Sequence, residues 1–329
     1  MWSLQFSGFW HKKRRTGISE EKNVRLLKQA VEQHVFIRHI SEHLLPDGTL
    51  DMEGNLKIWD DGMREFDKTY LWDGDGEAEK TGVDAAYLVF IPAEEKGRDT
   101  ILVAHGGGFT WRTGCEGPNV ALHFHKLGYN TAILTYRLQP NHGRRESMKD
   151  MQRAIRIIRS KREEWQLGER VIAMGFSAGA MICGNCATHF DEGKPDSEDP
   201  IERFSCRPDA AVISYGAMSC VSFPLPFGME LDDQLYGGTP EERYYFAPEK
   251  HVTPQTPPMF IWQTVSDDGR HGMCLAKALQ DAGVPYELHI MEGGVHGLGL
   301  ADGENDLAAY VPHIARWTTL CDEWIKMHA

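Results

Sequence analysis

Ser177 stands at the centre of a Gly-x-Ser-x-Gly pattern that runs from Gly175 to Gly179. An apolar run, residues 171–174, precedes the pattern, and a stretch rich in small residues follows it. This order is typical of a sharp turn from a buried strand into a helix, with a serine hydroxyl exposed at the apex. Glycine suits both flanking positions because a side chain there would collide with the turning backbone or the neighbouring strand. The pattern therefore predicts a nucleophilic serine.

Candidates for the groups that activate this serine lie near the C-terminal end of the chain. A serine is a weak nucleophile until a histidine accepts its proton, and the histidine needs a carboxylate to fix its tautomer. Asp267 and Asp268 directly follow an apolar run, and His296 lies in a glycine-rich stretch after the last such run. Catalytic groups of a doubly wound sheet lie on loops at the carboxyl ends of its strands. We therefore predict a Ser–His–Asp triad of Ser177, His296 and Asp267.

A glycine-rich segment at residues 105–109, His-Gly-Gly-Gly-Phe, follows another apolar run. Glycine lets a backbone amide approach a substrate oxygen closely. We therefore assign Gly107 and Gly108, together with the amide of Ala178, as donors to a tetrahedral oxyanion. A loop of this kind can instead hold phosphate, but the sequence has neither a Gly-x-Gly-x-x-Gly pattern nor a Walker lysine.

The elements that must position these groups alternate in pattern from residue 86 onward. Amphipathic segments separate most of the apolar runs that we expect to be strands, which are AYLVFIPA, TILVAHGG, NTAILTYRL, RVIAMGFS, DAAVISYGAM, PMFIWQTVSD and YELHIME. This alternation predicts an α/β fold, a doubly wound and mostly parallel sheet with helices on both faces. Residues 219–258, rich in proline and aromatic residues, predict an inserted cap-like segment that forms a pocket wall. Trp111 and Glu116, just past the glycine-rich loop, are further candidates for substrate contacts.

Residues 1–70 precede this alternation and predict an N-terminal extension, whereas residues 71–329 form the expected catalytic domain. Apolar residues at spacings of three and four predict an amphipathic helix over residues 19–45. Short alternating stretches such as residues 56–59 predict hairpins at a sheet edge. The extension could serve as a lid, or it could join two copies of the chain. A homo-oligomer is therefore one of the expected possibilities.

The composition argues against nucleic acid and membranes as partners. The chain has 48 acidic and 35 basic residues, a net charge of −13, which repels nucleic acid and anionic lipid. No apolar run reaches the ~18 residues that a membrane-spanning helix needs. Basic residues 12–15 follow an apolar start, the reverse of a secretory signal, and seven cysteines show no disulfide framework. We therefore expect a cytoplasmic protein with reduced thiols.

Four segments together resemble the α/β-hydrolase superfamily, near the hormone-sensitive-lipase-like carboxylesterases: residues 105–109, residues 175–179, Asp267 and residues 294–297. Two longer stretches, MQRAIRIIRSKREEWQLGERVIAMGFSAGAMICGNCATHF and GVPYELHIMEGGVHGLGLAD, are similar to bacterial esterases described as acetyl xylan esterase-like. The resemblance covers about residues 83–328. It implies a serine esterase that removes short acyl groups, commonly acetyl, from carbohydrates or small alcohols. The expected partner is a small-molecule or oligosaccharide ester, and no metal or other cofactor is expected.

The sequence departs from the resembled family at the acid. In that family an apolar residue and a proline usually follow the acid, whereas Asp268 and Gly269 follow Asp267 here. Register with the preceding Thr264 favours Asp267 over Asp268.

Two other functions are compatible with the same residues. An amide-directed hydrolase, such as a prolyl-type peptidase or an arylformamidase, would use the same triad. The stretch before residue 71 is too short for the propeller-sized domain of such a peptidase. A non-catalytic binding protein could keep the fold, although it would have no reason to keep every catalytic part. Cys183 and Cys186 have redox-pair spacing, but inside the expected helix that spacing suits two buried side chains.

Overall fold

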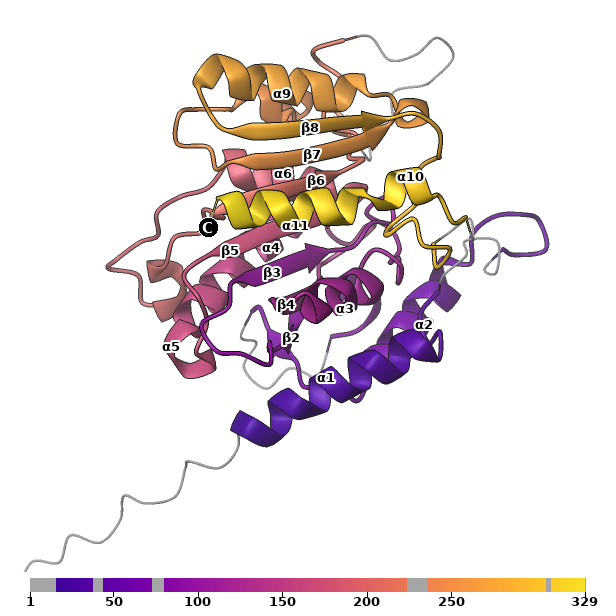
Figure 1. Cartoon of the computed structure of the whole chain (residues 1–329), viewed down its shortest axis with the longest axis vertical. Helices are drawn as coiled ribbons and strands as arrows, with labels where there is room; N and C mark the ends of the chain where they lie inside the picture. Colours follow the sequence, from indigo (N-terminus) through magenta and orange to yellow (C-terminus); the bar gives the residue numbers. More distant parts are fainter. Residues whose placement is uncertain (1–15, 38–43, 73–79, 224–235, 306–308, 329) are drawn as a thin grey trace, which may run out of the picture.

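A single mixed sheet organises the computed structural model, which describes residues 16–37, 44–72, 80–223, 236–305 and 309–328. Within these ranges the sheet has eight strands in the order β1-β2-β4-β3-β5-β6-β7-β8 (Figure 1). The strands are β1 (Thr69–Tyr70), β2 (Tyr87–Ile91), β3 (Thr100–Ala104), β4 (Asn130–Thr135), β5 (Val171–Phe176), β6 (Ala210–Ser214), β7 (Met259–Thr264) and β8 (Tyr286–Met291). Strand β2 is antiparallel to both β1 and β4, and every other neighbouring pair is parallel. The predicted mostly parallel sheet is confirmed.

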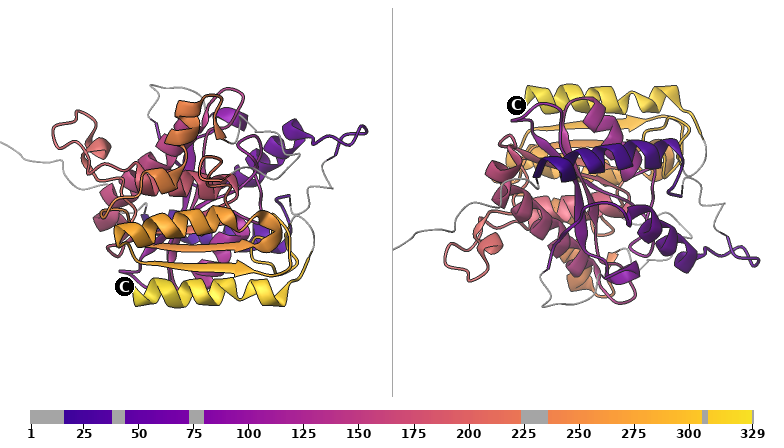
Figure 2. Two further views of the ribbon diagram at one scale, coloured as in Figure 1. Left: turned by 90° about the horizontal axis from the view of Figure 1, so that it is seen from above. Right: turned by 90° about the horizontal axis from the view of Figure 1, so that it is seen from below.

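Helices cover both faces of this sheet. One layer consists of α1 (Thr16–Glu32), α3 (Pro118–Lys126) and α11 (Trp317–Met327), and the other of α4 (Arg144–Ser160), α6 (Ala178–Thr188) and α9 (Arg270–Ala282). Figure 2 shows α9 and α11 on opposite sides of the strands. The shorter helices are α2 (Met52–Met63), α5 (Arg162–Trp165), α8 (Pro240–Tyr245) and α10 (Pro312–Ala315), and the 3-10 turns are η2 (Gly82–Asp84), η3 (Pro200–Arg203), η4 (Pro248–Lys250) and η5 (Val265–Asp267). The doubly wound α/β architecture is thus as predicted.

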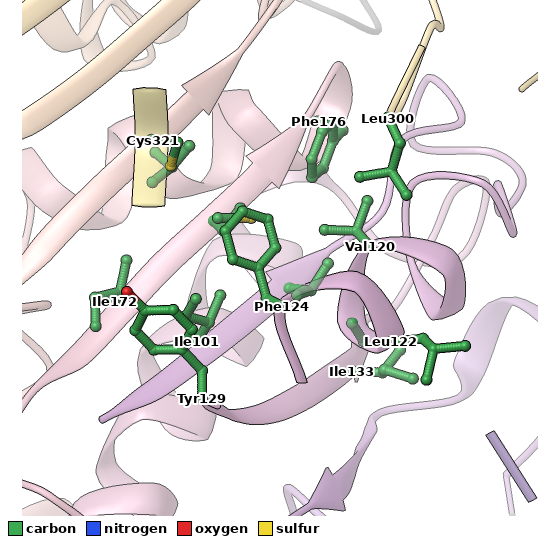
Figure 3. Packing of buried hydrophobic residues seen from close by; sticks show 14 of the residues in the cluster. Ile101, Val120, Leu122, Phe124, Tyr129, Ile133, Ile172, Phe176, Leu300 and Cys321 are labelled. Atoms are coloured by element: carbon green, nitrogen blue, oxygen red, sulfur yellow. The ribbon is translucent and has the colours of Figure 1, made fainter. Parts of the chain in front are cut away.

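The core lies on both faces of the central strands. In β3, Ile101 and Val103 join the cluster under α3 and α11, whereas Leu102 and Ala104 join the cluster under α4 and α6. Figure 3 shows Phe124 of α3 packed near Ile101. Because both faces of these strands are buried, their sequences are continuous apolar runs rather than alternating ones. Each fully buried Ile or Phe contributes about 1.5–3 kcal/mol.

The prediction of hairpins at residues 56–59 is wrong, because this segment belongs to helix α2. The side chain of Asp51 caps the helix by accepting a hydrogen bond from the Gly54 amide at 2.8 Å. Buried side chains of α2 lie four residues apart on one helix face: Asn55, Trp59 and Met63. Trp59 then donates from Nε1 to the Thr135 hydroxyl at 3.1 Å, which fastens α2 to the sheet.

The N-terminal amphipathic helix exists, but it ends earlier than predicted. Helix α1 stops at Glu32, and His34 takes a left-handed conformation with φ 53°. Beyond it, residues 38–43 lie outside the described ranges. Helix α1 contacts α3 and β2, and α2 contacts η2. The described part of residues 1–70 is therefore integrated with the sheet and its layers.

The predicted insertion at residues 219–258 contains α8 and η4, whereas residues 224–235 lie outside the described ranges. The η4 turn contacts both α6 and α9. Glu249 of this turn accepts hydrogen bonds from Ser219 at 2.5 Å and from Ser222 at 2.7 Å. The start and the end of the insertion are thus tied together next to α6 and α9.

None of the helices in the described ranges combines the length and apolar character required to cross a bilayer. The cytoplasmic location and a homo-oligomeric state stay predictions.

Candidate active site

Ser177 occupies a sharp turn between β5 and α6. Its backbone lies at φ 52° and ψ −119°, a conformation that costs a non-glycine residue about 1–3 kcal/mol. The Ser177 amide donates to the Ser214 carbonyl of β6 at 3.0 Å, which anchors the turn to the sheet. A Cβ atom at Gly175 would lie 2.2 Å from the Gly179 carbonyl oxygen, and one at Gly179 would lie 2.2 Å from the Ala104 carbonyl oxygen. The predicted steric reason for both glycines is confirmed.

The three residues of the predicted triad meet at this turn. His296 Nε2 lies 2.8 Å from the Ser177 hydroxyl oxygen, and His296 Nδ1 lies 2.7 Å from Asp267 Oδ1. Ser177 follows β5, Asp267 ends η5 directly after β7, and His296 lies on the loop after β8. This geometry allows an imidazole to take a proton from the serine while a carboxylate fixes its other nitrogen. The catalytic roles themselves stay predictions.

The two adjacent aspartates have different partners. Asp268 accepts hydrogen bonds from Arg270, at 2.8 Å from Nε and 2.6 Å from Nη2. These bonds and the positive charge of Arg270 lower the pKa of the Asp268 carboxyl. The Ser266 hydroxyl donates to the Gly294 carbonyl at 2.8 Å, which joins the loop of the acid to the loop of the histidine. Of the two acids, the structure places Asp267 at the imidazole.

The glycine-rich loop passes directly beside the serine. A Cβ atom at Gly106 would lie 3.0 Å from the Cβ atom of Ser177, so the two segments are in close contact. Gly107 has φ +114°, and a Cβ there would lie 2.1 Å from the Trp111 carbonyl oxygen. Gly108 has φ +57°, which also favours glycine. The loop thus lies beside Ser177 in a backbone conformation that favours glycine, and its role as an oxyanion donor stays a prediction.

The third predicted donor, Ala178, is the first residue of helix α6. Amides in the first turn of a helix have no partner within the helix and lie at the positive end of its dipole. The Gly106 amide, in contrast, is already engaged by Thr113 and Glu116, at 3.1 Å and 3.0 Å. Gly106 is therefore not the free donor of the loop, and the assignment of Gly107 and Gly108 as donors stays a prediction.

The side chain of Glu116 is enclosed in the protein, which argues against the predicted substrate contact. Its side chain is only 1% exposed, and Oε2 accepts hydrogen bonds from the Gly106 amide and from the Thr113 hydroxyl. Oε1 accepts a hydrogen bond from the Tyr215 hydroxyl at 2.7 Å. Both carboxylate oxygens are therefore occupied inside the protein. Trp111 is also largely buried, at 8% exposed, and its contact with substrate stays a prediction.

His105, the first residue of the glycine-rich segment, is fully buried. Burial, with a smaller effect from the nearby Arg112, lowers the pKa of His105 to about 3, so its imidazole is neutral. The ring stacks on Tyr136 with 4.4 Å between centroids, and Nδ1 lies 2.6 Å from the Gly106 carbonyl oxygen. His105 therefore supports the loop and is not available as a base.

Tyr215 is a part of the site that the sequence analysis missed. It directly follows β6, and its ring packs against the His296 imidazole in a T-shaped arrangement with 5.2 Å between centroids. Its hydroxyl donates to Glu116 and accepts a hydrogen bond from the Gly299 amide at 2.8 Å. The predicted run of residues 209–218 placed Tyr215 inside a strand, whereas β6 ends at Ser214 and Tyr215 follows it, as the other groups of the site follow their strands.

Comparisons with known proteins agree with this architecture. The BD-FAE family model matches residues 88–271. The chain is 30% identical over 258 residues to an endo-1,4-beta-xylanase B of Butyrivibrio fibrisolvens, which covers 75% of this chain and 38% of that protein. The chain therefore spans well under half the length of this curated relative.

Solved structures of esterases are also similar to this chain. An acetyl ester-xyloside bifunctional hydrolase from Caldicellulosiruptor lactoaceticus superposes with a TM-score of 0.70 and 31% identity, covering 79% of this chain and 96% of that one. Esterase Est2 from Thermogutta terrifontis superposes with a TM-score of 0.62 and 20% identity, covering 79% and 93%, which shows a shared fold alone. The resemblance to α/β-hydrolase esterases that the motifs predict is confirmed. The chain belongs to the BD-FAE family and has an α/β-hydrolase fold.

Proposed function

We propose that this protein is a serine carboxylesterase that removes short acyl groups, above all acetyl, from carbohydrates or small alcohols. The observation that supports the proposal most directly is the relay from Ser177 through His296 to Asp267, with contacts of 2.8 Å and 2.7 Å. Such a relay turns a serine hydroxyl into a nucleophile for an acyl carbonyl.

The reaction begins when the Ser177 oxygen attacks the ester carbonyl while His296 Nε2 takes the hydroxyl proton. The carbonyl electron pair moves onto the oxygen, and amides of the glycine-rich loop and of Ala178 stabilise the resulting oxyanion, each worth about 10²–10³ in rate. The tetrahedral intermediate then collapses, and the alcohol leaves with the proton from His296. Water, deprotonated by the same imidazole, releases the acid from the acyl-enzyme and restores the serine.

Exposure of the catalytic base supports a bulky alcohol. The His296 side chain is 52% exposed, whereas Asp267 behind it is 14% exposed. A leaving alcohol takes its proton from His296 Nε2, so it must approach this open side. A sugar residue of an oligosaccharide can therefore be accommodated while only the small acyl group faces the oxyanion donors. The relatives named for xyloside or xylan chemistry agree with a carbohydrate ester.

The described parts of the insertion at residues 219–258 lie on the side of α6 and α9, which begin beside Ser177 and Asp267 respectively. We assign this insertion to the pocket wall, where it selects among alcohols. The backbone amide of Ser219 donates a hydrogen bond to Nδ1 of His271 at 3.2 Å. This bond fixes the start of the insertion next to the loop that carries Asp267.

One set of assays tests this function. Purified protein is offered aryl esters of increasing chain length, acetylated xylo-oligosaccharides, a prolyl amide and N-formylkynurenine, each beside the Ser177→Ala variant. We expect Ser177-dependent turnover of acetyl esters that falls as the acyl chain lengthens. Preference for the prolyl amide or N-formylkynurenine would replace the esterase with an amide-directed hydrolase. Inertness with every substrate would favour a non-catalytic binding protein.

A further inference from the structure

Glu116 connects two loops of the site that are far apart in the sequence. We infer that Glu116, acting with Tyr215, is a positioning residue of the esterase. Its carboxylate sets the glycine-rich loop, and through the Tyr215 hydroxyl it sets the loop that carries His296. This inference rests on the proposed esterase function.

The hydrogen bonds of Glu116 balance its burial. A carboxylate removed from water needs donors, and Glu116 has three of them: the Gly106 amide, the Thr113 hydroxyl and the Tyr215 hydroxyl. Burial and the neighbouring Glu116 raise the pKa of Tyr215 well above its usual value, so the phenol keeps the proton that it donates. Each carboxylate oxygen thus accepts at least one hydrogen bond, and the Gly106 amide is shared between Glu116 and the Thr113 hydroxyl.

On one side this network fixes the predicted oxyanion donors. A Cβ atom at Gly106 would lie 2.2 Å from Glu116 Oε2, so the carboxylate is packed directly on the backbone of the loop. Gly107 and Gly108 are the next two residues. Oxyanion donors act within about 2.7–3.1 Å of the oxygen, so a shift of the loop by 1 Å is enough to weaken them.

On the other side the network reaches the base. The Tyr215 hydroxyl accepts a hydrogen bond from the amide of Gly299, three residues after His296. The Tyr215 ring contacts the imidazole itself, and its own backbone is fixed by a hydrogen bond from its amide to the Trp262 carbonyl at 2.9 Å. Tyr215 therefore supports both the ring of His296 and the segment that follows it.

The chemistry of a Glu116→Gln variant makes the inference testable. An amide has one acceptor oxygen, so it can accept from the Gly106 side or from the Tyr215 side, and its NH₂ group then faces a group that donates to Glu116 in the wild type. Tyr215→Phe removes one of the competing donors. The two substitutions should therefore be strongly non-additive.

The experiment measures p-nitrophenyl acetate hydrolysis and inhibition by phenylboronic acid, which forms a tetrahedral adduct with the serine. We expect Glu116→Gln to lower kcat about 10–100-fold, with KM changed less than about threefold, because the loss falls on the transition state. The inhibition constant of the boronic acid should rise by a similar factor. Tyr215→Phe should lower kcat about tenfold, and the double variant should lose no more than Glu116→Gln alone.

Asp99→Asn is the matched control. Asp99 is also a carboxylate that accepts several hydrogen bonds, here from Arg170, but it precedes β3 and so lies at the opposite end of this strand from Gly106. We expect it to lower the melting temperature while kcat and the boronic acid affinity stay within about twofold of the wild type.

The outcomes separate this inference from the function on which it rests. Absence of Ser177-dependent hydrolysis in the wild type would overturn both. Normal kcat and boronic acid affinity in folded Glu116→Gln, or equal losses in Asp99→Asn, would overturn the positioning role alone. If Glu116→Gln does not fold, Tyr215→Phe decides, since it removes a single hydroxyl, and unchanged kcat in that variant would refute the inference.

Discussion

The imidazole Nδ1 of His296 lies 2.7 Å from Oδ1 of Asp267, whereas the adjacent Asp268 is held by Arg270. Two neighbouring residues of the same type thus have different partners. The 3-10 turn η5 ends at Asp267, and Asp268 follows in a left-handed conformation that directs it elsewhere. The difference arises from the backbone, since the side chains are identical.

Substitution of the two acids should therefore give unequal effects. Asp267→Asn removes the acceptor that fixes the imidazole tautomer, and we expect kcat to fall about 10⁴-fold. Asp268→Asn leaves the contacts of His296 unchanged, so kcat should fall less than about tenfold. The variant should lose some stability, because its ion pair with Arg270 is lost. Steady-state hydrolysis of p-nitrophenyl acetate checks both. The reverse ranking would make Asp268 the acid.

Ser177→Ala should remove nearly all activity and keep the fold. Loss of the nucleophile is expected to lower kcat by about 10⁴–10⁶. The melting temperature should stay within a few degrees, because the Ser177 hydroxyl contributes one exposed contact to His296. A variant that unfolds, or one that retains turnover at a tenth of the wild-type rate, would contradict the role of Ser177.

The glycine at position 179 should tolerate no side chain. A methyl group there would lie 2.2 Å from the Ala104 carbonyl oxygen, so Gly179→Ala is expected to destabilise the protein by about 1–3 kcal/mol or more. Gly238→Ala provides the control, since its added carbon would meet only Glu242 Oε2 at 3.9 Å. Its effect should be within about 0.5 kcal/mol. Urea titration of both variants measures the difference, and equal midpoints would disprove the steric argument.

Stability should fall in acid because of His105. Its pKa is about 3 in the folded protein, compared with an ordinary value of 6.5, so the unfolded chain binds more protons between these values. The contribution of His105 to the free energy of unfolding is complete above pH 6.5. As the pH falls below this value, the free energy of unfolding decreases by about 1.4 kcal/mol per pH unit. His105→Asn keeps a donor near the Gly106 carbonyl but cannot titrate. Its unfolding free energy should show a slope shallower by about that amount, and an unchanged slope would exclude His105 as the cause.

The thiols of Cys183 and Cys186 should be inert in the folded protein. Both are fully buried in α6, and burial raises the pKa of each thiol well above its usual value. We expect iodoacetamide to label the half-buried Cys220 and Cys274 first, as mapped by mass spectrometry. Labelling in denaturant, where all sites react, is the control. Rapid labelling of Cys183 and Cys186 in the folded protein would contradict this prediction and would favour a redox function for the pair.

The central sheet and the candidate triad were predictable because their signals are local. Strands buried on both faces appear as continuous apolar runs, and the residues directly after three such runs include Ser177, Asp267 and the glycine-rich stretch around His296. Sequence order alone then suggests which groups meet, since the carboxyl ends of parallel strands share one edge.

Other features depend on partners that are distant in sequence. Trp59 of α2 bonds to a residue 76 positions away, and Glu116 bonds to Tyr215 across 99 positions. Nothing within residues 56–59 reveals the first contact, so their local alternation favoured a strand. A carboxylate next to a glycine-rich loop likewise resembles a substrate ligand until Tyr215 and Thr113 are seen to occupy its oxygens.

The groups of this site follow β3, β5, β6, β7 and β8, which are consecutive neighbours in the sheet. A slip of any one of these strands by a single position would displace its terminal loop by about 3.3 Å. A protein that refolds after dilution from denaturant with one strand shifted in this way would recover its helix and strand content. It would still have no activity. Regained turnover is accordingly a gauge of correct pairing across five strands, one that circular dichroism does not provide.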